Sequence, residues 1–229
     1  MDAGSRETRV PFERQKRRRL EELRREVSDE RVLAAIEEVR REAFVPPELY
    51  TRAYDNVPLG IGHGQTISQP LIVALMVAAI QPRETDVVLD VGTGSGYQAA
   101  VLSRLVAHVV GTERIPALAE RARRALRAEG IENVEVLQAG DEVGVPGRQF
   151  NGIVVGAAAP SVPPSLVAQL TDGGRLVMPV GSPFDQNLAR VTRRGEGTEV
   201  EWLGPCRFVP LIGPEGWPEG IALDDGSDG

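Results

Sequence analysis

The sequence predicts an α/β fold with a mainly parallel sheet, and two observations support this prediction. Between residues 86 and 181, short apolar segments alternate with helical segments, as in a parallel sheet covered by helices on both faces. A glycine-rich loop over residues 92–96 separates the first of these strands from the next helix. After Gly181 the alternation stops, and C-terminal antiparallel strands are expected.

The N-terminal third is expected to be a helical addition to this sheet. Residues 11–26 carry Arg and Glu at helical spacing, which predicts a solvated helix with internal ion pairs. Ser28 is a suitable N-cap for a second helix. The spacing of Val32, Ile36 and Val39 gives that second helix one buried face.

A loop with closely spaced glycines is expected over residues 54–70. Pro70 suits the first turn of the helix predicted over residues 71–80. We therefore treat residues 1–80 as an N-terminal helical segment that contains this loop.

Residues 81–213 are predicted to form the core of the protein. Its strands are expected at 87–91, 109–112, 134–137, 152–155, 175–178, 187–192 and 199–203, and its helices at 97–105, 116–128 and 165–170. The remaining residues, 214–229, are rich in Gly, Pro and Asp and predict a disordered acidic tail.

Composition excludes several classes of protein. The net charge of −7 argues against general binding to nucleic acid or to an anionic membrane surface. One cysteine and two histidines leave no intrachain disulfide and no Cys/His metal cluster, so no metal is expected. The longest apolar run, 71–80, is too short to span a bilayer, and the first residues lack the apolar centre of a signal peptide. A cytoplasmic protein is expected.

The glycine loop and the acids near it predict the bound cofactor. The loop has the spacing G-x-G-x-G rather than the G-x-G-x-x-G of dinucleotide enzymes. Asp90 would repel a pyrophosphate but suits an ammonium group, and Glu113 at the end of the second strand suits ribose hydroxyls. Asp141 follows the third strand and suits an adenine amino group. Together they predict S-adenosyl-L-methionine; a generic nucleotide site, or acids that serve as caps and surface charges, remain alternatives.

Several segments, taken in order, carry a family resemblance. The most specific is the loop over 62–70, Gly-His-Gly-Gln-Thr-Ile-Ser-Gln-Pro, and the others are 89–98, 156–160, 173–181 and 207–211. With them the chain resembles the protein-L-isoaspartate O-methyltransferase family from about Arg14 to Gly213. The glycine loop is shared by many methyltransferases, whereas the Thr-Ile-Ser-Gln-Pro loop is not.

The resemblance implies a fold, a reaction and a set of partners. The fold would be a Rossmann-like class I methyltransferase sheet with an N-terminal helical addition. The reaction would be methyl transfer from S-adenosyl-L-methionine to the free carboxylate of L-isoaspartyl residues, after which the ester closes to a succinimide and some aspartate is restored. The partners would be damaged isoaspartyl proteins and peptides, with no nucleic acid or membrane, and the enzyme is expected to be a monomer.

The resemblance also assigns site residues. Ser68 matches the active-site serine of the family, and Thr66 and Ile67 match a lid over the donor. Val209, Pro210 and Leu211 match the family residues that form a wall of the peptide groove. His63 is expected at the mouth of the site. The expected donor-binding residues are Asp90, Gly92, Thr93, Gly94, Ser95, Gly96, Glu113, Asp141 and Glu142.

The chemistry of the residues agrees with this assignment. A carboxylate is ionised at neutral pH and needs no general base, so positioning and desolvation are the main tasks of the protein. Ser68 would donate a hydrogen bond that orients the acceptor; the alternative is that it only caps the helix that starts near Pro70. His63 is equally compatible with an ordinary loop position.

Some residues depart from the family pattern. Glu142 and Val143 stand where Gly and an aromatic residue are usual, which affects the adenine edge. Asn151 and Gly156 replace a frequent Asp and Thr around the fourth strand, where donor and substrate are expected to meet. Such changes fit neutral drift or a retuned acceptor. Two competing functions therefore stay open: a carboxyl methyltransferase dedicated to one peptide in a biosynthetic pathway, and a non-catalytic nucleotide-binding regulator.

Overall fold

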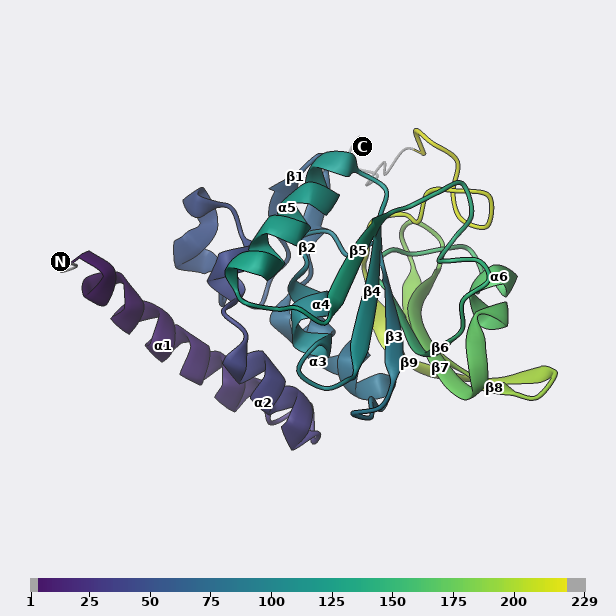
Figure 1. Cartoon of the computed structure of the whole chain (residues 1–229), viewed down its shortest axis with the longest axis horizontal. Helices are drawn as coiled ribbons and strands as arrows, with labels where there is room; N and C mark the ends of the chain where they lie inside the picture. Colours follow the sequence, from purple (N-terminus) through teal and green to yellow (C-terminus); the bar gives the residue numbers. More distant parts are fainter. Residues whose placement is uncertain (1–3, 222–229) are drawn as a thin grey trace, which may run out of the picture.

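The structure, a computed structural model, describes residues 4–221 and centres on a seven-stranded sheet (Figure 1). The strand order is β5-β4-β3-β6-β7-β8-β9; the pairs from β5 to β7 are parallel, and β7, β8 and β9 pair antiparallel. The strands are β3 (Val87–Val91), β4 (His108–Glu113), β5 (Val134–Gln138), β6 (Phe150–Val155), β7 (Leu170–Gly181), β8 (Gln186–Arg194) and β9 (Gly197–Cys206). The predicted parallel sheet and its antiparallel continuation are confirmed.

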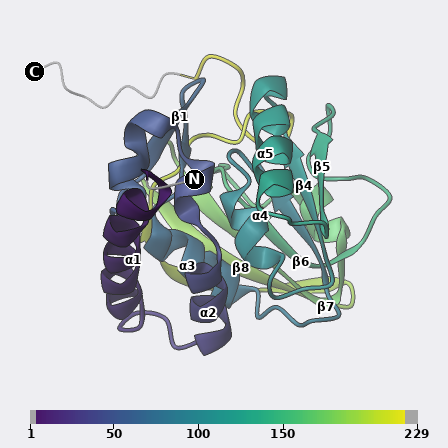
Figure 2. The same ribbon diagram turned by 60° about the vertical axis from the view of Figure 1, so that its left-hand side comes forward.

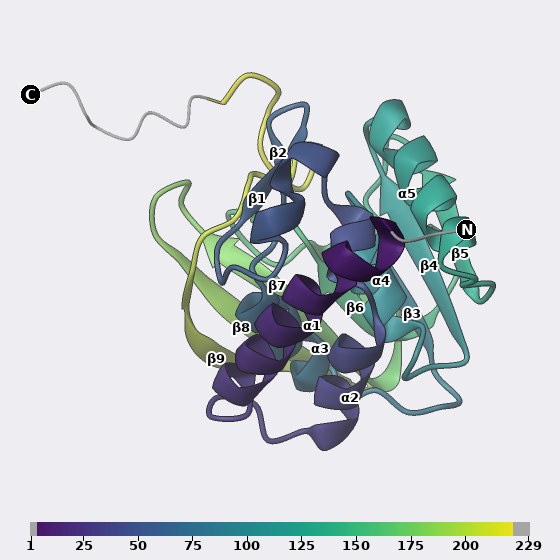
Figure 3. The same ribbon diagram turned by 90° about the vertical axis from the view of Figure 1, so that its left-hand side faces the viewer.

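Helices cover the two faces of the sheet unequally. The α-helices are α1 (Gly4–Leu23), α2 (Glu30–Glu38), α3 (Pro70–Ala79), α4 (Tyr97–Leu102), α5 (Pro116–Ala128) and α6 (Pro164–Ala168). Helices α1 to α3 lie in front of the sheet in Figures 2 and 3, whereas α6 lies on its other side in Figure 1. Neighbouring residues of one strand point to opposite faces, so Val88 joins the core under α1–α5 and Leu89 joins the core under α6.

The N-terminal helices differ from the prediction at their ends. Helix α2 is capped by Asp29 rather than Ser28, because the carboxylate of Asp29 accepts hydrogen bonds from the backbone N–H groups of Arg31 and Val32. The helix then ends at Glu38, and two short 3-10 helices, η1 (Arg41–Phe44) and η2 (Pro47–Arg52), follow it.

A β-hairpin lies where the sequence predicts only a loop. Its strands are β1 (Leu59–Gly62) and β2 (Gln65–Ile67), which pair antiparallel. The connecting residues His63 and Gly64 both have positive φ, 55° and 69°, as two-residue hairpin turns require. In β1, glycines occupy the outward positions instead of the β-branched residues that usually mark a strand, which explains why sequence patterning missed the hairpin.

The predicted tail begins with residues that make specific contacts. The backbone N–H of Trp217 donates to the carbonyl oxygen of Leu211 at 2.7 Å, and the carboxylate of Glu215 accepts hydrogen bonds from the backbone and side chain of Ser165. The structure thus differs from the predicted disorder at residues 214–217. Residues 222–229 of the predicted tail lie outside the described residues.

Hydrophobic packing joins the N-terminal segment to the sheet. Side chains of α2 and α3 such as Val32 and Met76 belong to the same buried cluster as Val88 and Val109 of the sheet. Between residues 4 and 221, no helix has both the length and the apolar character needed to cross a membrane.

Candidate active site

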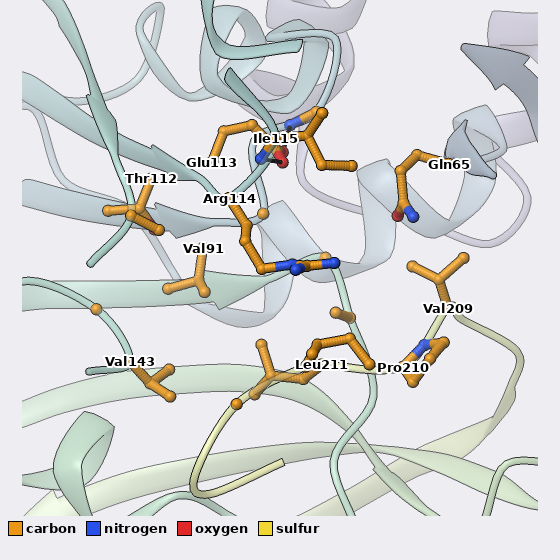
Figure 4. Close-up of a pocket in the computed structure, with 18 of the residues that line it drawn as sticks. Gln65, Val91, Thr112, Glu113, Arg114, Ile115, Val143, Val209, Pro210 and Leu211 are labelled. Carbon is orange, nitrogen blue, oxygen red and sulfur yellow. Dashed lines mark hydrogen bonds between the residues drawn. The ribbon is translucent and has the colours of Figure 1, made fainter. Parts of the chain in front are cut away.

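A first cavity opens at the carboxyl ends of β3, β4 and β6, where ligands bind in doubly wound sheets (Figure 4). The glycine loop after β3 and the chain after β4, β5 and β6 form its walls, together with residues of β2 and the C-terminal chain. It is lined by Gln65, Thr66, Val91, Gly92, Gly94, Thr112, Glu113, Arg114, Ile115, residues 139–144, Gly156, Ala157 and residues 209–213.

The glycine loop has the conformation that its composition requires. Gly92, Gly94 and Gly96 all have positive φ, between 54° and 87°, which other residues rarely adopt. A Cβ atom on Gly96 would lie 3.2 Å from the Cβ of Ala122, so this glycine also lets the loop pack against α5. The loop therefore presents backbone rather than side chains to a ligand.

Asp90 lies beneath the glycine loop and does not line the cavity. It is fully buried, and its carboxylate accepts hydrogen bonds from Thr93 Oγ1 at 2.6 Å and Gln98 Nε2 at 2.7 Å. Burial raises its pKa from 3.8 to about 6, although the two hydrogen bonds act in the opposite direction. Asp90 therefore does not face the cavity in which the ammonium group was predicted. Its carboxylate instead holds the glycine loop through Thr93 and Gln98.

Two further residues that were predicted to bind the methyl donor lie within the glycine loop. Thr93 and Ser95 are buried, and the hydroxyl of Ser95 accepts a hydrogen bond from the backbone N–H of Tyr97 at 3.3 Å. Neither residue lines the first cavity, but both line a small neighbouring cavity beside Ser68, whereas Gly92 and Gly94 line both.

Glu113 is placed as the sequence predicts. It is buried at the end of β4 and lines the cavity, and its Oε2 and Oε1 accept hydrogen bonds from the backbone N–H groups of Gly94 and Ile115 at 2.9 and 2.8 Å. A carboxylate has about four acceptor sites, so Glu113 retains capacity for ribose hydroxyls.

The far wall of the cavity contains both predicted and unpredicted residues. Asp141 and Glu142 are exposed and line it beside the buried Val143. Arg114 was not predicted; its side chain points into the cavity in Figure 4, and its guanidinium lies 2.8 Å from Glu219. Its position directly after Glu113, at a strand end, is the sequence signal that could have identified it.

A second cavity of about 400 Å³ adjoins the first. It is lined by Pro58, Thr66, Ser68, Gln69, Ile72, Gly156, Pro183, Pro205, Cys206, Arg207, Phe208 and Val209. A small third cavity lies between them and is lined by Ser68 and the glycine loop. Because Thr66 and Gly156 line all three cavities, a ligand in the first can meet a ligand in the second there.

Ser68 lies at this junction. It lines the second and third cavities, and within the described residues its hydroxyl has no hydrogen-bond partner. The N-cap of α3 is Gln69, with no side-chain cap hydrogen bond, so the structure does not support the alternative in which Ser68 serves only as a helix cap.

The two departures around β6 lie in different places. Gly156 is at the junction, and a Cβ atom there would lie 3.0 Å from the carbonyl oxygen of Gly92, so glycine allows β6 and the loop to approach closely. Asn151 lies near the amino end of β6, at the other end of the strands from the cavities. Its side-chain oxygen accepts a hydrogen bond there from the backbone N–H of Val87 at 2.9 Å. The expectation that Asn151 lies near the meeting point of donor and substrate is therefore wrong, because it belongs to the start of the strand.

The remaining predicted residues divide between the cavities. Val209 lines both main cavities, whereas Pro210 and Leu211 line the first one rather than the predicted peptide groove. His63 is exposed at the tip of the hairpin and lines none of the three adjoining cavities. Cys206 lines the second cavity, and burial raises the pKa of its thiol to about 11, so it stays protonated at neutral pH.

Comparisons with known proteins show the family of the chain. The family model for protein-L-isoaspartate(D-aspartate) O-methyltransferase matches residues 14–216. A protein-L-isoaspartate O-methyltransferase of Petrotoga mobilis is 47% identical over 216 residues, which cover 91% of this chain and all of the relative. Protein-L-isoaspartate O-methyltransferase 1 of Rhodopseudomonas palustris is 52% identical, with 84% of this chain and 80% of the relative covered.

Solved structures give the same result. A protein-L-isoaspartate O-methyltransferase is similar with a TM-score of 0.77 and 27% identity, over 88% of this chain and 67% of the other. A Plasmodium falciparum beta-aspartate methyltransferase in complex with S-adenosyl-L-homocysteine has a TM-score of 0.72 at 24% identity, over 83% and 95% of the two chains, and shares the fold.

Proposed function

The chain belongs to the protein-L-isoaspartate(D-aspartate) O-methyltransferase family, and from this premise we propose how its residues divide the reaction between them. The enzyme methylates the free carboxylate of L-isoaspartyl residues in damaged proteins, with S-adenosyl-L-methionine as the donor. The observation that carries the proposal is the meeting of two cavities at Thr66 and Gly156, beside Ser68.

The first cavity is proposed as the donor site. When bound, S-adenosyl-L-methionine supplies an activated methyl group on a sulfonium. Glu113 would accept hydrogen bonds from the ribose hydroxyls, and Asp141 and Glu142 would border the adenine. Gly92 and Gly94 would let the methionine part rest on the backbone, with Asp90 and Thr93 holding the loop in shape from below.

The second cavity is proposed as the acceptor site. An ordinary carboxyl group has a pKa of about 3 to 4, so the acceptor arrives ionised and no side chain has to remove a proton. The donor would supply its methyl group to one carboxylate oxygen and leave as the neutral thioether. Ser68 would donate a hydrogen bond to the other oxygen and so fix the approach of the first.

Water must be excluded where the cavities meet. Thr66 on the hairpin and Val209 on the C-terminal chain line both main cavities and would cover the reacting atoms. Ile67, the last residue of β2, is buried and lines the small third cavity between the two sites. Removing water from a carboxylate strengthens its attraction to the sulfonium, so this cover would add to the effect of positioning.

Transfer of labelled methyl groups to matched peptides tests the function. Two peptides that differ only in Asp or L-isoAsp at one position are incubated with the enzyme and labelled S-adenosyl-L-methionine. We expect labelling of the isoaspartyl peptide and little labelling of the aspartyl peptide. Equal labelling of both peptides, or none, would contradict the proposal.

The same assay separates the competing functions. A repair enzyme labels many isoaspartyl peptides of unrelated sequence, whereas an enzyme dedicated to one peptide labels few of them. A regulator binds the donor without turnover. The broad acceptor cavity, with apolar residues such as Ile72 and Phe208 in its lining, favours the repair enzyme.

The proposal includes a monomeric cytoplasmic enzyme. The single cysteine and the net charge of −7 are compatible with a reducing compartment and with no role for nucleic acid or membrane surfaces. Sedimentation velocity of the active enzyme tests the monomeric state.

A further inference from the structure

Arg41, at the start of η1, is an arginine completely buried outside the cavities described above. Its Nε donates a hydrogen bond to the carbonyl oxygen of Ala53 at 2.7 Å, and its Nη2 donates one to the carbonyl oxygen of Ser68 at 2.7 Å. The guanidinium carbon lies 4.7 Å from the ring centroid of Tyr97. Arg41 therefore contacts Ser68 of the acceptor site and the residue that follows the glycine loop.

The burial of this charge is costly. Among the side chains of residues 12–221 no carboxylate forms an ion pair with Arg41, and its Nη1 atom is buried without a hydrogen-bond partner there. Burial lowers its pKa, but an arginine remains protonated at any physiological pH. A buried cation with only carbonyl and aromatic partners is expensive for stability, which suggests that it is retained for another reason.

The hydrogen bond from Arg41 determines how one peptide group is oriented. No peptide bond in the described residues is cis, so the carbonyl of Ser68 and the N–H of Gln69 point in opposite directions. The carbonyl faces Arg41, and the N–H therefore faces away from it. Ser68 and Gln69 both line the acceptor cavity.

We infer that Arg41 is a positioning residue, which orients the Ser68–Gln69 peptide group so that the Gln69 N–H and the Ser68 hydroxyl together hold the acceptor carboxylate. Through its contact with Tyr97, Arg41 also fixes the distance between this peptide group and the glycine loop. Arg41 itself touches neither substrate. The inference rests on the proposed function of the second cavity as the acceptor site.

Arg31 provides a matched control. Its guanidinium also donates hydrogen bonds to two backbone carbonyls, those of Pro82 at 3.0 Å and Leu105 at 3.5 Å, but it lines none of the cavities. Both arginines join the N-terminal segment to other parts of the chain. Arg31 is exposed whereas Arg41 is completely buried, so Arg31→Lys controls only for the loss of arginine-to-carbonyl hydrogen bonds. The greater loss of stability expected in Arg41→Lys is accounted for by the fraction of competent molecules.

The test compares donor binding with acceptor turnover in Arg41→Lys, Arg31→Lys and the unaltered enzyme. Calorimetry with S-adenosyl-L-homocysteine gives the donor Kd and the fraction of competent molecules, and turnover of an isoaspartyl peptide is expressed per competent molecule. For Arg41→Lys we expect kcat/KM to fall about 10- to 100-fold, as for a misplaced reacting group, with the donor Kd changed less than about threefold. Arg31→Lys should keep both values. An unchanged kcat/KM in Arg41→Lys would overturn the inference.

A second measurement uses the unaltered enzyme and decides the matter if Arg41→Lys does not bind the donor. With S-adenosyl-L-homocysteine bound, addition of the isoaspartyl peptide should shift the amide resonance of Gln69, and the aspartyl peptide should not. An isoaspartyl peptide that binds without moving this resonance would overturn the inference. If the unaltered enzyme fails to methylate isoaspartyl peptides at all, the proposed function fails instead.

Discussion

The carboxylate of Glu113 at the end of β4 accepts a hydrogen bond from the backbone nitrogen of Gly94 at 2.9 Å, and so fixes the glycine loop that follows β3. The same carboxylate lines the donor cavity. One side chain thus shapes the loop and faces the cavity proposed for the donor, so donor binding should be sensitive to it in two ways.

Glu113→Ala should weaken binding of S-adenosyl-L-homocysteine by about 1–3 kcal/mol, because buried N–H groups and ribose hydroxyls lose their acceptor. Isothermal titration calorimetry measures the change. Glu132→Ala, at an exposed position outside the cavities, is the control and should bind normally. An unaltered Kd in Glu113→Ala would remove Glu113 from the donor site.

Ser68→Ala should lower methyl transfer about 10- to 100-fold, which corresponds to about 1.4–2.8 kcal/mol of barrier. Its melting temperature should change little, since Ser68 makes no cap hydrogen bond with α3. Turnover and melting are measured on one sample, with Ser68→Thr as the variant that keeps a hydroxyl. A protein that melts lower yet turns over at the normal rate would refute the role of Ser68.

Asp90 should make stability depend on pH in an unusual direction. Burial raises its pKa from 3.8 to about 6, so the folded protein binds this proton more tightly than the unfolded chain. The contribution of Asp90 to stability is therefore complete below about pH 4 and is lost as the pH rises through about 6, by up to about 3 kcal/mol at 1.36 kcal/mol per pKa unit.

Denaturant unfolding of the unaltered protein and of Asp90→Asn at several pH values tests this dependence. Relative to Asp90→Asn, the unaltered protein should lose stability between pH 4 and pH 7. Asp55→Asn, a change of an exposed carboxylate, is the control for general effects of charge. A difference between the unaltered protein and Asp90→Asn that stays constant over this range would contradict the assigned pKa.

The C-terminal chain should contribute to stability as far as Trp217. Ending the chain after Gly213 removes the hydrogen bond between Trp217 and Leu211 and the cap that Glu215 provides for Ser165. We expect a loss of about 1–2 kcal/mol, or several degrees in melting temperature. A chain that ends at residue 221 keeps these contacts and should melt normally; equal melting of both shortened chains would show that the contacts add nothing.

The sheet and the position of Glu113 at its edge follow from local sequence. Strand β3 is a continuous apolar run before a glycine loop, and Glu113 lies directly at a strand end, so both follow from rules of parallel sheets. The position of Asp90 was equally clear, but its role was not. Whether a side chain at a strand end faces a ligand or turns under a loop depends on partners such as Gln98, which local patterns do not reveal.

Arg41 illustrates a different limit of prediction. In the sequence it is one of two adjacent arginines in a charged stretch, and nothing local distinguishes it from the exposed Arg40. Its burial results from contacts with Ala53, Ser68 and Tyr97, which are distant in the chain. The burial of this arginine therefore depends on tertiary contacts that local sequence patterns do not show.

One hydrophobic cluster joins Val32 and Met76 to Val88 and Val109, and this determines how the enzyme unfolds on heating. The hairpin loop over 62–70 and the glycine loop over 92–96 pack on the same core. The segment before residue 80 has no core of its own and should therefore unfold together with the sheet. Both halves of the site should disappear in a single cooperative transition. On heating, donor binding and methyl transfer should therefore be lost together, without an intermediate that still binds the donor.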